Sequence, residues 1–145
     1  MTPPELIAAA REAARHAHAP YSRFSVGAAV LLTDGSVVTG ANFENASYGL
    51  SLCAETVAIA KAASEGRLRD VSEIAVIGGM QVDGAARGSD PVRPCGRCRQ
   101  VLNEASGMGG RDITLYCAGA EGDGYEVHAL RDLLPHAFGP ADLGL

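Results

Sequence analysis

The sequence has no surplus of basic residues. Its 145 residues contain 12 lysines and arginines against 17 aspartates and glutamates, which gives a formal net charge of −5. A protein that grips a polynucleotide needs clustered positive charge to displace the counterions of the phosphates. We therefore expect a small-molecule ligand and no nucleic-acid polymer as a partner.

Long apolar runs are also missing. Charges interrupt the first 20 residues, "MTPPELIAAAREAARHAHAP", which excludes a signal peptide there. No window approaches the roughly 20 apolar residues that span a bilayer. Internal repeats and dividing linkers are absent, while hydrophobic residues make up 47% of the chain. These features predict one domain over residues 1–145, a cytoplasmic location and no membrane partner.

Cysteine is scarce, with four in the chain. Thiols stay reduced in the cytoplasm, so four cysteines favour a metal site or catalysis over a disulfide framework. Three of them stand in two short motifs, "SLCAE" around Cys53 and "RPCGRC" ending at Cys98.

Turn and capping residues divide the chain into helices and strands. Thr2 and Glu5 form a capping box, Pro20 follows the end of that helix, and Asp34-Gly35 is a strong hairpin signal. Helices are expected at residues 3–18, 54–66, 95–107 and 131–140, and strands within 24–43, 72–79, 112–119 and 124–130. Residues 81–94 are polar and glycine-rich, which predicts a loop.

This order of elements predicts an α/β fold. Three layers, α/β/α, are expected, with one mixed sheet of about five strands and helices on both faces. Gly27 lies inside the first predicted strand, which indicates either a bulge or close packing of another backbone.

The cysteine motifs predict a metal site. Cys95 and Cys98 form a C-x-x-C pair at the start of one predicted helix, and Cys53 lies at the start of another. Three sulfurs can then converge from two helix N-termini, where free N–H groups and the helix dipole stabilise thiolates. Zinc is the metal that suits such a set, and three protein ligands leave its fourth position for water.

Two further residues decide between a structural and a catalytic zinc. Cys117, in the predicted strand "ITLYCAG", is typical of a small buried core residue, with a fourth metal ligand as the alternative. Glu55 follows Cys53 by two residues. A glutamate there commonly does no more than favour the helix dipole, but beside a water on zinc it can move a proton to substrate. The layout C-x-E followed by P-C-x-x-C is the signature of zinc-dependent nucleobase deaminases.

Longer stretches carry a closer resemblance. "PYSRFSVGAAV", "GANFENASYGLSLCAE", "PCGRCRQVL" and "LLPHAFGP" resemble the small cytidine deaminases of pyrimidine salvage, and the resemblance covers nearly the whole chain. It implies a cytidine-deaminase-like fold, one Zn²⁺ per subunit, and a homotetramer whose sites are shared between subunits. The implied reaction is hydrolysis of cytidine and deoxycytidine to uridine and deoxyuridine.

The resemblance also implies which residues carry the chemistry. Cys53, Cys95 and Cys98 are the implied zinc ligands. Glu55 is the implied proton shuttle, and a backbone carbonyl near Ala54 is implied to hold the leaving amine.

Substrate-binding residues are implied in the same way. Asn42 and Glu44 are implied to bind the ribose hydroxyls, as an amide and a carboxylate can, and Phe24 to pack on the pyrimidine. From the residues alone, Phe24 is more typical of core at the start of a strand, and Asn42 and Glu44 are typical of a turn at a strand end. Three residues are implied to reach the site of a neighbouring subunit: Ala46, Tyr48 and Phe138.

Thr56 departs from the family pattern. Many members have arginine after the catalytic glutamate, where the guanidinium offsets the net negative charge of a zinc with three thiolates. Threonine donates one hydrogen bond and no charge. We hypothesise that the two helix N-termini, or Arg93 or Arg97, supply the compensation.

Two alternative functions stay open at this point. One is a deaminase of a related aminopyrimidine nucleoside such as blasticidin S, because such enzymes share "PCGRCRQVL". The other is a non-catalytic structural zinc module, which would need a fourth protein ligand and no Glu55.

Overall fold

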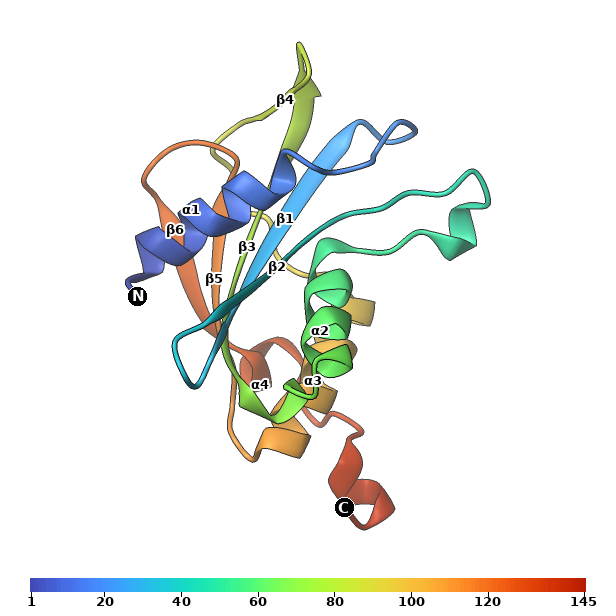
Figure 1. Cartoon of the computed structure of the whole chain (residues 1–145), viewed down its shortest axis with the longest axis vertical. Helices are drawn as coiled ribbons and strands as arrows, with labels where there is room; N and C mark the ends of the chain where they lie inside the picture. Colours follow the sequence, from blue (N-terminus) through green and yellow to red (C-terminus); the bar gives the residue numbers. More distant parts are fainter.

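A mixed β-sheet with helices on both faces forms the molecule (Figure 1). The computed structural model describes all 145 residues. The helices are α1 (Pro3–Ala14), α2 (Ala54–Ser64), α3 (Gly96–Gly109) and α4 (Leu130–Leu133), with 3₁₀ turns η1 (Tyr48–Leu50), η2 (Leu68–Asp70) and η3 (Pro140–Leu143). The strands are β1 (Phe24–Leu32), β2 (Val37–Ala41), β3 (Val71–Val82), β4 (Ala85–Arg87), β5 (Thr114–Gly119) and β6 (Tyr125–Ala129).

The strand order is β2-β1-β3-β5-β6, with β4 paired to the end of β3. The pair β3–β5 is parallel and the other pairs are antiparallel. Two apolar clusters lie on opposite faces of this sheet, one under α1 and the other under α2 and α3. The predicted three-layer arrangement is therefore confirmed.

The sheet has six strands, where about five were predicted. The additional strand is β4, which lies in the segment predicted to be a loop. Asp83 and Gly84 between β3 and β4 both have positive φ, 51° and 81°, as the two central residues of a tight hairpin turn require. The Asp-Gly pair at 83–84 was therefore a hairpin signal of the same kind as the pair at 34–35.

Helix α1 begins as predicted and ends earlier. The capping box between Thr2 and Glu5 is present, but the helix stops at Ala14 and not near His18. The N–H of His18 instead donates to the carbonyl of Asn42 at 2.9 Å. The pairing of this segment with the chain after β2 outweighs the helix propensity of the alanine-rich run.

Glycines let the helices approach the sheet closely. A Cβ on Gly27 would lie 1.9 Å from the carbonyl oxygen of Ala10 in α1, and a Cβ on Gly40 would lie 2.6 Å from the carbonyl oxygen of Ala54 in α2. The close packing predicted at Gly27 is thus confirmed. Both contacts set the distance between the helices and the sheet.

The C-terminal third differs from prediction in two details. Helix α3 continues through Gly107 and ends at Gly110, which has a φ of 69°. A Cβ on Gly107 would lie 2.8 Å from Pro140, so this glycine admits the C-terminal tail. The helical turn predicted at 131–140 is only α4, because the chain leaves the helix before Pro135 and His136 has a φ of 54°.

None of the helices combines the length and apolar character needed to cross a bilayer.

Candidate active site

Three cysteine sulfurs meet at the N-termini of two helices. Cys53 caps α2, Cys95 caps α3, and Cys98 lies in the first turn of α3. Their Sγ atoms all lie within 4.8 Å of one another, and those of Cys53 and Cys95 are 3.9 Å apart. Sulfurs held about 2.3 Å from a tetrahedral zinc are separated by about 3.8 Å. The donor set and its spacing therefore fit zinc.

The group contains no fourth protein ligand. Cys117 is fully buried in the apolar cluster under α2 and α3 and lies outside the sulfur group. It is a core residue, as its sequence context predicted. A zinc ion bound by Cys53, Cys95 and Cys98 would have three protein ligands, so its fourth coordination position would be left for a non-protein ligand.

Hydrogen bonding shifts the pKa values of two of the three thiols, Cys53 and Cys98, in opposite directions. The pKa of Cys53 is lowered to about 6, chiefly by hydrogen bonding to the Cys98 thiol, with smaller contributions from Cys95 and from the charge of Arg97. These effects outweigh burial, which acts to raise that pKa. Hydrogen bonding to Cys53 and burial raise the pKa of Cys98. The Oγ1 of Thr56 lies 3.4 Å from the Sγ of Cys98 and opposes that rise. Thr56 therefore contacts a metal-site sulfur directly, although it brings no charge.

Of the two arginines considered for charge compensation, one is already paired. Arg93 donates from Nε and Nη2 to the carboxylate of Glu126 at 2.8 and 2.6 Å, and the same carboxylate contacts His128. Arg97 is exposed and has no carboxylate partner. Its charge acts on Cys53, which makes Arg97 the stronger candidate.

Glu55 lies in the first turn of α2 beside the sulfurs and is only 4% exposed. Burial, reinforced by the negative charge of Cys53, raises the pKa of its carboxyl to about 6. A carboxyl with a pKa near the working pH can both take up and release a proton. The position and the pKa of Glu55 are those of a general acid and base.

A cavity of about 240 Å³ opens next to these groups. Its lining brings together residues from β1, from the segment after β2, from the start of α2 and from the segment before α3: Val26, Asn42, Glu44, Ser51, Leu52, Cys53, Ala54, Glu55, Val92, Arg93 and Cys95. The sequence had not indicated a site role for Val26, Ser51, Leu52 or Val92. Ser51 and Leu52 lie in the motif "SLCAE", Val26 lies in "PYSRFSVGAAV", and Val92 lies two residues before "PCGRC", so position within or beside these motifs was the available signal.

Asn42 and Glu44 line this cavity and also organise the chain around it. The Asn42 side chain accepts from the N–H of Val26 at 2.9 Å and donates to the carbonyl of Phe24 at 2.8 Å. Glu44 accepts from the backbone N–H groups of Tyr21 and Ser22 at 3.0 and 3.1 Å. These bonds fix both side chains in the wall of the cavity.

The N–H of Ala54, and not its carbonyl, points out of the N-terminal end of α2. It is the first residue of the helix, where N–H groups have no intrahelical partner. Its carbonyl oxygen lies against Gly40 of β2. The role implied by the resemblance, a backbone carbonyl near Cys53–Ala54 that holds the leaving amine, stays a prediction.

The remaining residues singled out in the sequence lie outside this cavity. Phe24 lines a neighbouring cavity that shares Val92 with it. Tyr48 lies with Glu44 in a further cavity, with its ring 5.5 Å from that of Tyr21, and Ala46 is exposed on the same segment. Phe138 is 61% exposed and its carbonyl accepts from two amide side chains of α3.

The comparisons with known proteins agree with one another. The sequence model of the family described as "Cytidine and deoxycytidylate deaminase zinc-binding region" matches residues 2–109. A cytidine deaminase of Halalkalibacterium halodurans is 49% identical over 138 residues, covering 95% of each sequence. One of Mycobacterium tuberculosis is 44% identical over 134 residues, 92% of this chain and 87% of that protein. The crystal structure of a cytidine deaminase from Burkholderia pseudomallei, 42% identical, has a TM-score of 0.81 and covers 95% of this chain and 100% of that one.

Proposed function

The chain belongs to the cytidine and deoxycytidylate deaminase family, and on that premise we propose that it hydrolyses cytidine and deoxycytidine to uridine and deoxyuridine with release of ammonia. The observation that carries the proposal is the buried Glu55 beside three zinc-spaced sulfurs at one end of a cavity. Its place is pyrimidine salvage, where free nucleosides are the substrates.

The metal site is held by Cys53, Cys95 and Cys98. Bound there, zinc supplies Lewis-acid chemistry that makes water nucleophilic at neutral pH. Glu55 takes a proton from the attacking water and delivers it to N3 of the pyrimidine, while the water oxygen forms its bond to C4. Glu55 then takes the proton of the new hydroxyl on C4 and delivers it to the amino group. The C4–N bond breaks, the C4 carbonyl forms, and ammonia leaves. One water is consumed and one ammonia is released.

The chain's backbone and polar side chains orient the substrate in this proposal. The N–H of Ala54 at the open end of α2 donates to the ring carbonyl. Asn42 and Glu44, which line the same cavity, bind the ribose hydroxyls, and Phe24 packs on the ring from the adjoining cavity. The contacts to the ribose favour a nucleoside over a free base.

An absorbance assay of cytidine conversion, run beside one with blasticidin S, tests the proposed function. Turnover of cytidine and little turnover of blasticidin S is the expected result. The reverse preference would contradict it. The comparisons do not favour the blasticidin S alternative, and a structural zinc module is disfavoured by the absence of a fourth protein ligand.

Glu44→Ala is expected to lower kcat/KM for cytidine by about 10- to 100-fold, because hydrogen bonds to a charged group contribute about 1.5–3 kcal/mol. The same variant should act on 2′,3′-dideoxycytidine as the unmodified enzyme does, because that analogue lacks the hydroxyls. Glu44 also supports the backbone of Tyr21 and Ser22. An equal loss with both substrates would show that this support, and not sugar binding, is its role.

Thr56→Val is expected to weaken zinc retention by roughly tenfold, since groups that hydrogen-bond metal ligands typically contribute that much. Valine has the shape of threonine and removes the hydroxyl that contacts Cys98. Thr56→Ser keeps the hydroxyl and is the matched control. Competition with a chromogenic chelator measures retention, and equal retention in both variants would exclude the hydroxyl from the metal site.

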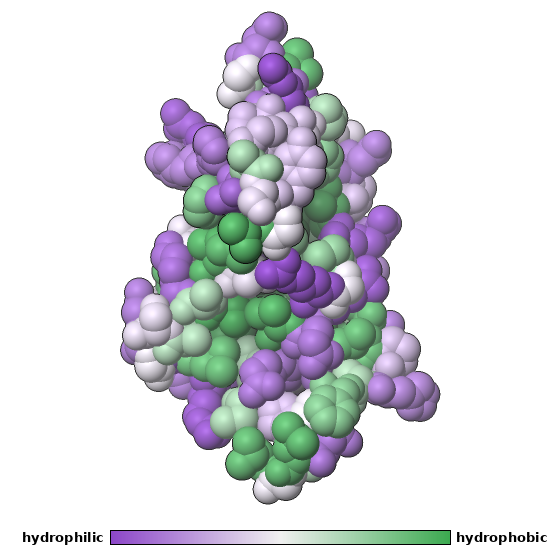
Figure 2. Space-filling view, turned by 90° about the vertical axis from the view of Figure 1, so that its right-hand side faces the viewer, coloured by the Kyte–Doolittle hydropathy of each residue, from purple (hydrophilic) through white to green (hydrophobic).

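The assembly in this proposal is a homotetramer in the cytoplasm with sites shared between subunits. Tyr48 and Phe138 support it, because they are 73% and 61% exposed in the single chain and line no part of its own metal-site cavity. Figure 2 shows hydrophobic side chains across the middle of the face that carries α2 and again at its lower end. Ala46, exposed on the same segment as Tyr48, belongs to the shared surface.

A further inference from the structure

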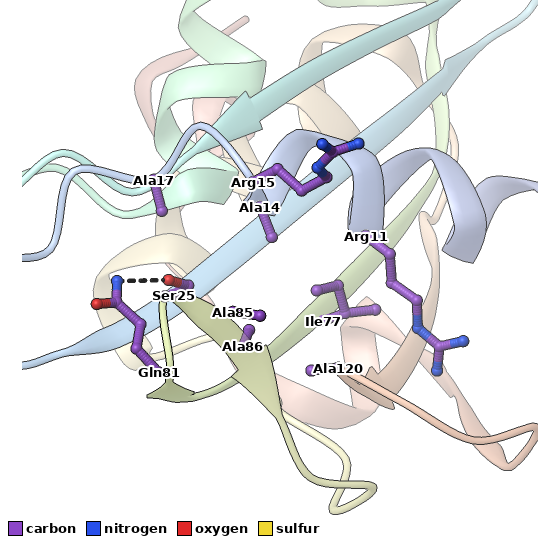
Figure 3. Close-up of a pocket in the computed structure, with 11 residues that line it drawn as sticks. Arg11, Ala14, Arg15, Ala17, Ser25, Ile77, Gln81, Ala85, Ala86 and Ala120 are labelled. Carbon is purple, nitrogen blue, oxygen red and sulfur yellow. Dashed lines mark hydrogen bonds between the residues drawn. The ribbon is translucent and has the colours of Figure 1, made fainter.

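A second, larger cavity lies on the opposite face of the sheet from the metal site. Its volume is about 580 Å³, against about 240 Å³ for the cavity at Glu55. Figure 3 shows it between α1 and the β3–β4 hairpin. Volumes of 300–1,000 Å³ are typical of sites for small organic ligands. The proposed deamination makes no use of it.

The two cavities lie on opposite sides of the same strand. Successive side chains of β1 point to opposite faces, so Ser25 lines the larger cavity while Val26 lines the one at the metal site. Ile77, in the apolar cluster under α1, forms part of the floor. A ligand in the larger cavity would therefore not contact the sulfurs or Glu55.

One end of this cavity carries positive charge without a matching carboxylate. Arg11 donates to the carbonyls of Gly119 and Gly122 at 2.9–3.2 Å, and none of its contacts is with an acid. Its Nη1 has no partner within the chain. The charge of Arg11 helps to lower the pKa of Glu121. The Glu121 carboxylate, however, is hydrogen-bonded to Arg87 and to the N–H of Gly88 and not to Arg11. A guanidinium anchored in this way, with no carboxylate hydrogen-bonded to it, is suited to bind phosphate or carboxylate.

The other end carries a polar pair of which one member, Ser25, is buried. Gln81 donates from Nε2 to the Oγ of Ser25 at 2.8 Å, as the dashed line in Figure 3 marks. Ser25 is 4% exposed. The pair keeps one free donor, the Ser25 hydroxyl hydrogen, and one free acceptor, the Gln81 Oε1. The Ser25 hydroxyl hydrogen can donate to a ring carbonyl of a pyrimidine base.

Small side chains form the wall between these ends. Ala85 and Ala86 come from β4, Ala17 follows α1, and Ala120 follows β5. They leave room for a flat body between the charged end and the polar end. Arg15 also lines the cavity, but it pairs with Glu12, so Arg11 is the main anion contact.

We propose that this cavity binds a pyrimidine mononucleotide, with its phosphate on Arg11 and a carbonyl of its base on Ser25. The site is separate from the proposed catalytic site and does not depend on turnover. Its ligand is charged, whereas the nucleosides of the proposed reaction are neutral.

Isothermal titration of the zinc-loaded protein with uridine 5′-monophosphate, together with spectra of ¹³C-methyl alanines, tests this site. We expect the nucleotide to bind and to shift the methyl resonances of Ala85, Ala86 and Ala120, while the methyl resonance of Ala54 stays unchanged. Shifts confined to Ala54 would place the nucleotide in the other cavity and overturn the proposal, as would absence of binding.

Variants separate the two ends of the ligand. Arg11→Met is expected to weaken binding at least tenfold and Ser25→Ala several-fold, while Arg131→Met, a solvent-exposed arginine elsewhere, should have no effect. Arg11→Lys keeps the charge and is expected to retain part of the affinity if Arg11→Met proves unstable. Inorganic phosphate is the second probe. If it binds as tightly as the nucleotide, the base contributes nothing and the proposal is wrong.

Discussion

Replacing Glu55 by glutamine is expected to lower kcat for cytidine by about 10³- to 10⁴-fold, the upper part of the range for general acid–base catalysis. Glutamine has the same size and cannot carry the proton. Zinc content and the melting temperature should stay as in the unmodified protein, because Glu55 is outside the sulfur group. Steady-state kinetics with metal analysis on the same samples provides the measurement.

The control for Glu55→Gln is Glu65→Gln, which changes the same residue type at the other end of α2. It should be fully active. If Glu55→Gln retained near-normal turnover with its zinc in place, Glu55 would have no part in the reaction.

The pH dependence gives a second view of the same carboxyl. The pKa of Glu55 is raised to about 6, so the carboxylate form needed to accept a proton predominates above that pH. Below it, kcat/KM should fall about tenfold per pH unit as the carboxyl becomes protonated. Glu55→Gln should lack this acidic limb, which would identify the titrating group.

Cys95→Ser is expected to abolish zinc retention and reduce activity by more than about 10⁴-fold. Serine is a poor ligand for zinc at neutral pH, and the remaining two sulfurs form an incomplete site. Cys95 is exposed, so this change disturbs the site without opening a hole in the core. The thermal transition should also fall, because a metal that binds only the folded chain stabilises it.

Cys117→Ser is the matched control for the loss of a sulfur. Cys117 is fully buried away from the sulfur group, so the variant is expected to be less stable but to keep its zinc and its activity. Retention of zinc by Cys95→Ser, or its loss in Cys117→Ser, would mean that the ligand set is wrong. Chelation of the unmodified enzyme, followed by restoration with zinc, completes the comparison.

Local sequence patterns accounted for most of the elements of the fold. The capping box at Thr2, the Asp-Gly turn at residue 34 and the apolar run of β3 act over a few residues, so their signals can be read without the rest of the chain. The errors came where distant segments compete with local preference. Helix α1 ends early because His18 bonds to Asn42, a contact that spacing along the chain does not reveal.

The residue types and spacing of "CAE" and "PCGRC" by themselves determined the candidate metal ligands and the candidate proton carrier, because the chemistry of thiolates and carboxylates belongs to the side chains. Tertiary packing alone decided how those groups meet. It brought two helix N-termini together across 42 residues, put Thr56 against Cys98 and turned the carbonyl of Ala54 toward β2. It also formed the larger cavity, which Arg11 lines, from α1, β1 and the β3–β4 hairpin. Such contacts depend on how helices and strands pack in three dimensions, and no local pattern encodes them.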